Sequence, residues 1–345
     1  MKILVTGAAG FIGSNFVRHL LQSHPDDHVL VVDKLTYAGN LRNLDDVLSD
    51  PRVQFAKLDI CDPAVNDVID GCHAVVHFAA ESHVDRSIED ASPFMRTNVE
   101  GTWRILEASR RGRVDRFIHV STDEVYGSLG PEGQFRETSP LDPTSPYAAS
   151  KAASDLLVLA AVKTYRFPAI ITRCTNNYGP FQFPEKFIPL MIAQALEGKT
   201  LPVYGDGRNV RDWIHVSDHC RAIDLILRKG DEGEIYNVGG GCELENIAVA
   251  RAILRTLGRP ETLLNFVTDR PAHDRRYALD YSKLGEKLGW TPQWDFDRGL
   301  DNTIHWYREN GPWLEETRSG EYRSYFERHY TQRSGMLEAS GGATR

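Results

Sequence analysis

Three glycines near the start of the chain restrict its fold more than any other feature. Gly7, Gly10 and Gly13 have the spacing G-x-x-G-x-x-G, after a short apolar segment and before a stretch with helical spacing. Glycines between a strand and a helix allow a tight turn and let backbone N–H groups approach a pyrophosphate at the helix N-terminus. The run therefore predicts a β-α unit that binds a dinucleotide, although a glycine-rich turn can also occur without a ligand.

An acidic residue further along supports this interpretation. Asp33 lies 20 residues after Gly13 and ends a second apolar segment, where a carboxylate can bind the ribose hydroxyls. The same carboxylate would repel the additional phosphate of NADP, so NAD is the expected cofactor. Asp59 is a candidate for the adenine side of this site, and its alternative role is to cap a turn.

Short apolar strands alternate with helical stretches through the first half of the chain. The predicted strands are Lys2–Thr6, His28–Val32, Gln54–Asp59, Ala74–Phe78, Phe117–Val120 and Ala169–Arg173. The predicted helices are Gly13–Ser23, Pro93–Arg111 and Pro146–Tyr165. Repeated alternation predicts an α/β fold, a Rossmann-type doubly wound parallel sheet with helices on both faces. Ligands in such sheets bind at the carboxyl ends of the strands.

The pattern changes after about residue 174, where loops become longer and richer in Pro, Gly and Asn. We expect residues 1–175 to form the NAD-binding domain, with segments near 210–240 returning to it. Residues 176–330 are expected to form mainly a smaller C-terminal substrate-binding domain. Residues 331–345 are small and polar, and we expect a disordered tail.

Bulk properties exclude several classes of function. The net charge of −8 argues against nucleic acid or an anionic membrane as the main partner. No apolar run reaches the roughly 20 residues that a membrane span needs, and we interpret the apolar N-terminus as a first strand, not a signal peptide. The five cysteines form no CxxC pair, so we expect no metal site and no disulfide framework, only free thiols in a reducing cytoplasm.

Tyr147 and Lys151 are candidates for acid-base chemistry. They lie at positions i and i+4, on one face of a predicted helix. A free tyrosine has a pKa of about 10, and a nearby ammonium together with a positive nicotinamide ring would lower it. The pair could then act as a general base on a hydroxyl that is being oxidised. Because YxxxK is common by chance, this prediction depends on the glycine run and on the strand that ends in Ser121-Thr122.

Two adjacent carboxyl groups, Asp123 and Glu124, follow the hydroxyl of Thr122. A simple dehydrogenase or epimerase needs one base at the oxidised carbon, whereas this pair supplies a second base and an acid. Two carboxyl groups in one enclosed site push their pKa values apart, which separates the two roles. The alternative is a solvated acidic turn.

With these motifs in place, the chain resembles the extended short-chain dehydrogenase/reductases and, more narrowly, the dTDP-glucose 4,6-dehydratases. The similar segments include TGAAGFIG, VVDKLTYAGN, HFAAESHVDRSI, VSTDEVYG, SPYAASKAASD, NNYGPFQFPEKFIP, LPVYGDGRNVRDWIHVSDHC, EIYNVGG and DRPAHDRRYA. They run from residue 2 to about residue 281, with a weaker likeness to about residue 330. Thr175 stands where the family more often has Ser or Cys, and Ala272 stands where Gly is common.

The resemblance implies a lyase of deoxysugar biosynthesis that converts dTDP-glucose to dTDP-4-keto-6-deoxyglucose and water. The hydride would pass from sugar carbon 4 to tightly bound NAD and return to carbon 6, so that NAD is regenerated in each turnover. Tyr147, assisted by Lys151, would deprotonate the 4-hydroxyl, which Thr122 orients. Glu124 would remove the carbon 5 proton, and Asp123 would protonate the departing 6-hydroxyl.

The resemblance also implies the rest of the site. Substrate contacts are expected from His83 on the sugar side, Arg211 and Asn246 at the diphosphate, Pro202 and Tyr204 as walls of the base pocket, Arg270 and His273 near the nucleotide, and Asn176, Lys186 and Phe187 closing over it. Further cofactor contacts are expected from Phe11, Ile12, Lys34, Leu35, Thr36, Ile60, Ala79, Ala80, Ser82, Thr97 and Asn177. Taken singly, each arginine could be a surface charge and His83 could be structural.

Several alternatives stay open. The predicted helices Pro93–Arg111 and Pro146–Tyr165 resemble the pair that forms a four-helix bundle between subunits, so we expect a homodimer, but their apolar faces could instead pack on their own sheet. An NAD-dependent 4-epimerase or decarboxylase would share the glycine run and the Tyr-Lys pair, although it has no use for both acids. A non-catalytic NAD(H)-sensing protein would need neither pair. Thymidine is favoured as the base, with uridine and cytidine open.

Overall fold

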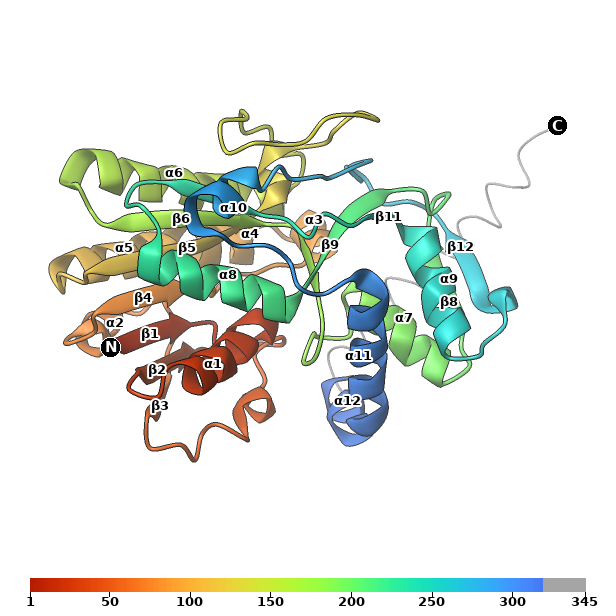
Figure 1. Ribbon diagram of the computed structural model, residues 1–345, viewed down its shortest axis with the longest axis horizontal. Coiled ribbons are helices and arrows are strands. Elements are labelled where there is room, and N and C mark those ends of the chain that lie inside the picture. Colours follow the sequence, from red (N-terminus) through yellow and green to blue (C-terminus); the bar gives the residue numbers. More distant parts are fainter. Residues whose placement is uncertain (319–345) are drawn as a thin grey trace.

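Seven parallel strands form the central sheet, in the order β10-β6-β5-β4-β1-β2-β3 (Figure 1). The computed structural model describes residues 1–318. The strands are β1 (Lys2–Thr6), β2 (His28–Asp33), β3 (Val53–Lys57), β4 (Ala74–His77), β5 (Arg116–Thr122), β6 (Ala169–Cys174) and β10 (Ile235–Val238). The strand order reverses between β1 and β4, which is where doubly wound sheets open a ligand crevice. The predicted α/β fold class is confirmed.

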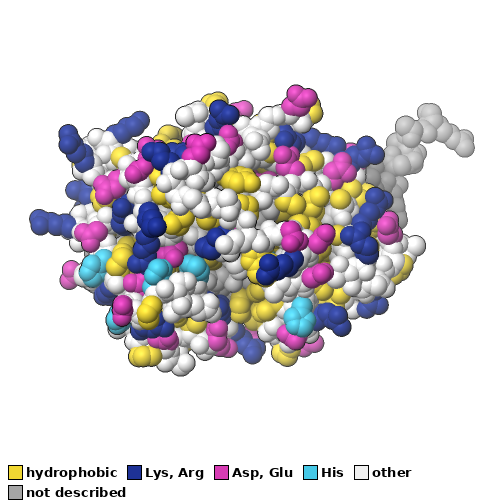
Figure 2. Space-filling model, in the orientation of Figure 1, with side chains coloured by type: hydrophobic (Ala, Val, Ile, Leu, Met, Phe, Trp, Pro, Cys, Tyr) yellow, Lys and Arg dark blue, Asp and Glu magenta, His cyan; other side chains and the backbone are white. Residues whose placement is uncertain are grey.

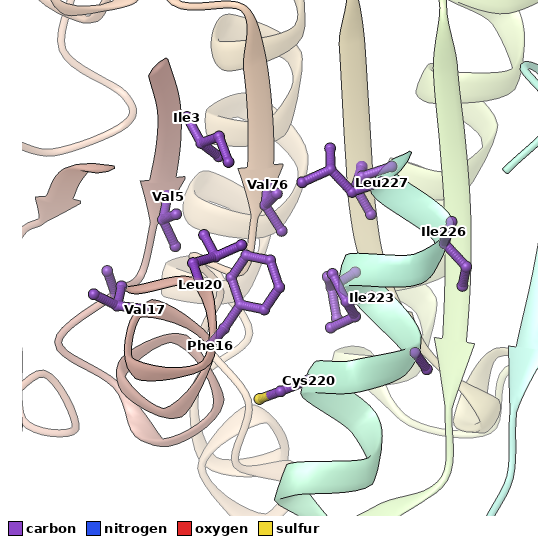
Figure 3. Packing of buried hydrophobic residues seen from close by; sticks show 14 of the residues in the cluster. Ile3, Val5, Phe16, Val17, Leu20, Val76, Cys220, Ile223, Ile226 and Leu227 are labelled. Carbon is purple, nitrogen blue, oxygen red and sulfur yellow. The ribbon is translucent and has the colours of Figure 1, made fainter. Parts of the chain in front are cut away.

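Helices cover both faces of this sheet because its side chains alternate between two apolar cores. Ile3 and Val5 of β1 pack with α1 (Phe11–Ser23), α8 (Val216–Lys229) and α10 (Ser282–Leu288), and Figure 3 shows Phe16 and Leu20 of α1 with Ile223 and Leu227 of α8 in this core. Leu4 points the other way, into the core of α2 (Val65–Ile69), α5 (Thr102–Arg111) and α6 (Pro146–Tyr165). A strand that is buried on both faces reads as a continuous apolar run, as β1 does.

The second half of the chain builds a smaller unit beside the carboxyl ends of the strands (Figure 1). It contains the sheet β11-β9-β7 and the pair β12-β8, and a third apolar core lies among its helices. Its strands are β7 (Asn176–Tyr178), β8 (Leu201–Tyr204), β9 (Val210–His215), β11 (Glu243–Glu245) and β12 (Leu264–Val267). Its helices are α7 (Phe187–Leu196), α9 (Asn246–Thr256), α11 (Phe296–Glu309) and α12 (Gly311–Thr317).

Several predicted elements, namely α1, β2, β4, β5 and β6, differ from the observed bounds by one or two residues at an end. Two further differences concern the site more closely. The segment Pro93–Arg111 is not one regular helix: α4 (Ser92–Phe94) leads into a π-helical turn, η2 (Met95–Gly101), before α5 begins. The third predicted strand ends at Lys57, so Asp59 lies in the following turn. By contrast, β1 and α6 have the predicted bounds. α6 begins where predicted because the Ser145 hydroxyl accepts a hydrogen bond from the Ala148 N–H and proline occupies the first turn.

Three elements from the second half, β10, α8 and α10, return to the first. Strand β10 pairs with β6, and α8 packs beside α1 (Figure 1). Within the described part of the chain, no helix has the length and hydrophobicity that a membrane crossing requires. Basic and acidic side chains are interspersed on the face shown in Figure 2. The predicted tail, residues 331–345, lies outside the described residues.

Candidate active site

A cavity of about 310 Å³ opens at the carboxyl ends of β1, β2, β4, β5 and β6. It collects the predicted catalytic side chains Thr122, Asp123, Glu124, Tyr147 and Lys151. It also collects Gly7, Gly10, Phe11, Ile12, Gly13, Asp33, Lys34, Thr36, Asp59, Ile60, Ala79, Ala80, Ser82, Thr97 and Asn177. Leu35 is the exception among the predicted cofactor residues, since its side chain packs against the core of α1 and α8 instead.

The glycine run forms the turn between β1 and α1. Gly7 has a φ of 67°, and a Cβ there would lie 2.6 Å from the backbone nitrogen of Ala79, so only glycine lets the two loops meet. No acidic side chain stands in the first turn of α1, which leaves its positive end available to an anion. These features fit a pyrophosphate held by backbone N–H groups.

The two acids at the edge of this cavity have different surroundings. Asp33 accepts hydrogen bonds from the backbone N–H groups of Ala9 (2.9 Å) and Leu35 (2.8 Å), which fixes its carboxylate beside the glycine turn. Asp59 pairs with Lys34 at 2.8 Å and accepts a bond from the Cys61 N–H at 2.9 Å. Asp59 therefore both caps a turn and lines the cavity. The position of Asp33 suits the ribose of a dinucleotide, so the residues present fit NAD.

Helix α6 places Tyr147 and Lys151 on the floor of the cavity. The backbone N–H of Tyr147 donates to the Ser87 hydroxyl of α3 (Val84–Glu89), and the Lys151 ammonium donates to the carbonyl of Val120 at 2.8 Å. Asn98, in the π-helical turn, donates to the Ser150 hydroxyl at 2.8 Å. These bonds hold α6 against α3, β5 and η2 and so position both side chains.

Burial dominates the electrostatics of this pair. It raises the pKa of Tyr147 well above 10, and the nearby Glu124 carboxyl raises it further. It also lowers the pKa of Lys151 to about 8, with Asp155 opposing the change. The protein alone therefore keeps the phenol protonated, and additional positive charge is needed before Tyr147 can act as a base.

Asp123 and Glu124 begin a short 3₁₀ turn, η3 (Asp123–Tyr126), directly after β5. Burial and the neighbouring Glu124 raise the pKa of Asp123 to about 8. Burial also raises the pKa of Glu124, but Arg270, Lys186 and Arg211 oppose this rise. The Thr122 hydroxyl contacts both, since it donates to the Asp123 carboxylate at 3.3 Å and accepts from the Glu124 N–H. The two carboxyl groups thus differ in the direction that an acid and a base require.

A second cavity, of about 170 Å³, adjoins the first on the side of the smaller unit. Five residues line both cavities, namely Ser82, Glu124, Asn176, Glu185 and Lys186. The second cavity also collects the predicted substrate residues His83, Phe187, Pro202, Tyr204, Arg211, Asn246, Arg270 and His273. Glu124 therefore lies where the two cavities meet.

Three cations line the second cavity, namely Arg211, Lys186 and Arg270. The Arg211 guanidinium donates to the carbonyls of Val210 (2.7 Å) and Asp274 (3.0 Å) and lies 4.4 Å from the centre of the Tyr277 ring. Within residues 1–318 it has no carboxylate at ion-pair distance, and burial lowers its pKa. Lys186 donates to the Ser82 carbonyl, and burial lowers its pKa also. A buried cation without an anionic partner is costly, so this cavity is suited to an anionic ligand.

Several other predicted contacts have structural partners as well. The Tyr204 hydroxyl donates to the Asp85 carboxylate at 2.8 Å, and the Arg270 Nε lies 3.5 Å from the other oxygen of that carboxylate. His273 packs edge-on against the Tyr204 ring. The His83 ring lies 3.4 Å from the Glu185 carbonyl, and burial lowers its pKa. These contacts fix the walls of the second cavity before any ligand binds.

Sequence reasoning missed some lining residues. Cys174 and Thr175 line the first cavity, and a signal for them existed because Cys174 ends β6 opposite Thr122 in the sheet. The others depend on contacts between distant segments, which no local pattern indicates. They include Glu81, Gln182, Phe183 and Glu185 in the first cavity, and Asp85, Trp213 and Tyr277 in the second. Within the described residues, no cluster of His, Cys, Asp and Glu is arranged to hold a metal ion.

Comparison with known proteins adds independent information. The family model described as GDP-mannose 4,6 dehydratase matches residues 4–303. A protein of Actinoplanes sp. named dTDP-glucose 4,6-dehydratase is 52% identical over 319 residues, which cover 91% of this chain and 99% of that protein. A protein of the same name from Neisseria meningitidis is 50% identical and covers 93% of this chain and 97% of its own length.

Solved structures agree with these matches. The dTDP-glucose 4,6-dehydratase DesIV from Streptomyces venezuelae, solved with NAD and TYD (dTDP) bound, superposes with a TM-score of 0.90 at 53% identity. That match covers 92% of this chain and all of the other. A UDP-glucuronic acid 4-epimerase from Bacillus cereus, in complex with UDP-glucuronic acid and NAD, gives a TM-score of 0.85 at 30% identity, over 90% of this chain and 99% of its own.

Proposed function

This chain belongs to the dTDP-glucose 4,6-dehydratase family, and we propose that it converts dTDP-glucose to dTDP-4-keto-6-deoxyglucose and water. One observation carries the proposal. Two buried carboxyl groups, Asp123 and Glu124, lie in the same cavity as Tyr147 and Lys151 and have different electrostatic surroundings. An oxidation followed by the loss of water needs three proton-transfer groups: a base for the hydroxyl, a base for the carbon-bound proton and an acid for the leaving hydroxyl. Tyr147, Glu124 and Asp123 supply them.

The cofactor of this reaction is NAD, held by the glycine turn, by Asp33 and by the other residues of the first cavity. When bound, NAD supplies an acceptor for the hydride of sugar carbon 4 that is restored in the same turnover, and its positive ring adds to the cation of Lys151. Lys151 stabilises the Tyr147 phenolate, which takes the proton of the 4-hydroxyl. Thr122 orients that hydroxyl.

The elimination uses the two carboxyl groups. The 4-keto group makes the proton on carbon 5 acidic, and Glu124, at the junction of the cavities, removes it. Asp123 holds a proton at neutral pH because its pKa is raised to about 8, and it gives that proton to the 6-hydroxyl as water leaves. Glu124 then returns its proton to carbon 5, and the hydride taken from carbon 4 would return to carbon 6. Asp123 regains a proton in place of the one that Tyr147 took from the 4-hydroxyl, so water is the only group lost.

The nucleotide is assigned to the second cavity. Arg211, Lys186 and Arg270 face it and are suited to a diphosphate. Tyr204 and Pro202 offer flat walls for a pyrimidine. Thymidine is the base that we propose, because the curated relatives with about 50% identity carry dTDP-glucose in their names. We assign NAD binding to residues 1–175 with returning segments near 210–240, and sugar-nucleotide binding mainly to residues 176–330.

Exposed apolar side chains support a homodimer through α5 and α6. Met95, Trp103 and Leu156 are 43%, 47% and 57% exposed, and they lie on η2, α5 and α6. Apolar patches of this kind on neighbouring helices mark association surfaces. Replacement of Trp103 by glutamate should convert the dimer to a monomer in size-exclusion chromatography with light scattering, whereas a wild-type monomer would contradict the dimer.

We place the enzyme in the cytoplasm, which the five free cysteines support.

The proposal is tested by incubating purified protein with dTDP-glucose, without added NAD, followed by mass spectrometry. A product that has lost one water, with no accumulation of NADH, supports it. The 30% identity to a UDP-glucuronic acid 4-epimerase makes an epimerase the relevant competitor. An unchanged mass with a new hexose isomer on separation would assign that activity instead. UDP-glucose, tested in parallel, measures selectivity for the base.

A further inference from the structure

A row of buried polar side chains crosses the sheet behind Lys151, on the face that α5 and α6 cover. Thr6, His77 and His119 are aligned on the neighbouring strands β1, β4 and β5. The His77 ring lies within hydrogen-bond distance of two hydroxyls, that of Thr6 at 2.7 Å and that of Thr102 at 3.0 Å. The proposed reaction uses none of these groups, although polar side chains are costly in a core.

A buried ion pair, Asp155 with Arg173, lies beside His119 at the end of this row. Asp155 of α6 is fully buried, and its carboxylate accepts a hydrogen bond from the Arg173 Nε at 2.8 Å. Arg173, on β6, also donates to the Tyr126 hydroxyl at 2.9 Å. The His119 Nε2 lies 3.3 Å from the other Asp155 oxygen. A buried carboxylate stays ionised only where opposite charges and hydrogen bonds offset the cost of removing it from water.

Helix α6 connects this pair to the catalytic groups. Tyr147, Lys151 and Asp155 follow one another at intervals of four residues, so they share one buried face of the helix. The Lys151 ammonium donates to a backbone carbonyl, and no carboxylate of residues 1–318 lies within 4.0 Å of it. Asp155 lies one turn away on the same buried face, where its charge opposes the lowering of the Lys151 pKa by burial. Asp155 thus acts on two cations, Lys151 and its direct partner Arg173.

The other groups around Lys151 carry no negative charge at neutral pH. Burial, followed by Lys151, lowers the pKa of His119 to about 4, and burial lowers that of His77 well below 6.5, so both rings are neutral. Burial raises the pKa of the Cys174 thiol to about 12. Asp155 is ionised, because His119 and Arg173 outweigh the effect of burial and hold its pKa below the ordinary value. Further charges lie at the ends of the row: Asp123 and Glu124 face Tyr147, and Glu137 accepts from the Asn237 N–H beside Tyr126.

We infer that Asp155 is a positioning residue for the reaction: its carboxylate is the buried counter-charge that keeps Lys151 cationic beside Tyr147. The inference rests on the proposed function, because it assigns the task of Lys151 in that reaction. Arg173 is always protonated, and it forms an ion pair with the same Asp155 carboxylate. The charge on Lys151 is therefore set by the balance between Asp155 and Arg173, both outside the cavity and out of reach of substrate.

This balance predicts opposite effects for two substitutions. Asp155→Asn leaves two cations without their anion, so Lys151 loses its proton at a lower pH. Arg173→Gln leaves Asp155 to Lys151 alone, so Lys151 holds its proton to a higher pH. The readout is the basic limb of the pH profile for the first hydride transfer, followed in single turnovers as the absorbance of reduced nicotinamide on mixing with dTDP-glucose. This step precedes the elimination, so titration of Asp123 does not enter it.

We expect the basic limb to move down by about one pH unit or more in Asp155→Asn, to move up in Arg173→Gln, and to return close to wild type in the double variant. Asp224→Asn is the matched control, since Asp224 is also buried and paired with an arginine, Arg228, but lies on α8. Shifts in the same direction, or no shift in Arg173→Gln, would overturn the inference. If Asp155→Asn does not fold, Arg173→Gln alone decides. Failure of wild type to transfer hydride would instead overturn the proposed function.

Discussion

Asp123 and Glu124 are adjacent in the chain, but the charges beside them act on their pKa values in opposite directions: an acid raises that of Asp123, and cations lower that of Glu124. Burial, followed by the charge of Glu124, raises the pKa of Asp123 to about 8. Burial also raises the pKa of Glu124, but Arg270, Lys186 and Arg211 oppose this rise. The cations that suit the second cavity to a diphosphate therefore also hold the neighbouring carboxyl group closer to its basic form. Substrate binding and acid-base chemistry share the same charges.

Replacing Glu124 by glutamine should separate oxidation from elimination. The variant keeps Tyr147 and Lys151, so carbon 4 can still be oxidised, but it has no base for the carbon 5 proton. We expect kcat to fall by about 10²–10⁴-fold, with reduced nicotinamide accumulating on addition of dTDP-glucose. Full turnover, or loss of turnover without any reduced nicotinamide, would contradict the role given to Glu124.

Asp123→Asn should make the protein more stable as it becomes less active. The pKa of Asp123 is about 8 in the fold and about 4 in an unfolded chain, so the unfolded state binds fewer protons between these values. Stability is therefore lost as pH rises from about 4 to about 8. The substitution removes this loss, which is on the order of 2–4 kcal/mol at neutral pH. Thermal midpoints of variant and wild type should converge at acid pH and diverge towards pH 8, and a constant difference would contradict the assignment.

The pH profile of kcat should fall on the alkaline side. Both Asp123 and Lys151 act in their protonated forms, and burial brings the pKa of each to about 8, upward for Asp123 and downward for Lys151. We expect kcat to decrease above about pH 8 as either proton is lost. Steady-state rates at saturating dTDP-glucose measure this directly, and a kcat that rises through this range would be inconsistent with Asp123 as the acid.

Arg211→Met should weaken nucleotide binding without destabilising the fold. The guanidinium is buried, and within residues 1–318 its hydrogen bonds go to two carbonyls and it lies over the Tyr277 ring, so methionine removes a desolvated charge. We expect dTDP to bind about 30-fold more weakly or worse, corresponding to about 2 kcal/mol, with an unchanged or higher thermal midpoint. Arg275→Met is the control, because Arg275 is exposed and pairs with Asp206. Equal losses in both variants in calorimetric titration with dTDP would exclude the diphosphate role.

The sequence predicts a strand or helix correctly where residues within that segment determine its bounds. β1 is an apolar run, and α6 carries a serine cap and an early proline, so both have the predicted bounds. The π-helical turn η2 could not be predicted, because long-range packing determines it. A Cβ at Gly101 would lie 2.6 Å from Ile60, and Asn98 bonds the backbone of Glu81.

The candidate site also contains residues that local sequence predicts and residues that only long-range contacts place. Strand ends and helix starts are visible in the sequence, and Asp33, Thr122 and Tyr147 all meet in one cavity. Leu35 was expected beside the cofactor, but its backbone adopts a φ of 58° and its side chain packs into the core. Asp85 was not expected, since its contacts with Tyr204 and Arg270 join segments more than 100 residues apart.

The position of the transferred hydrogen tests the central claim most directly. Purified protein, without added NAD, is given dTDP-glucose that carries deuterium at carbon 4, and the product is examined by mass spectrometry and NMR. We predict a product that has lost one water and retains the deuterium at carbon 6, because the hydride leaves carbon 4 and returns within the same site. An unchanged mass, or deuterium that is still at carbon 4, would contradict the account.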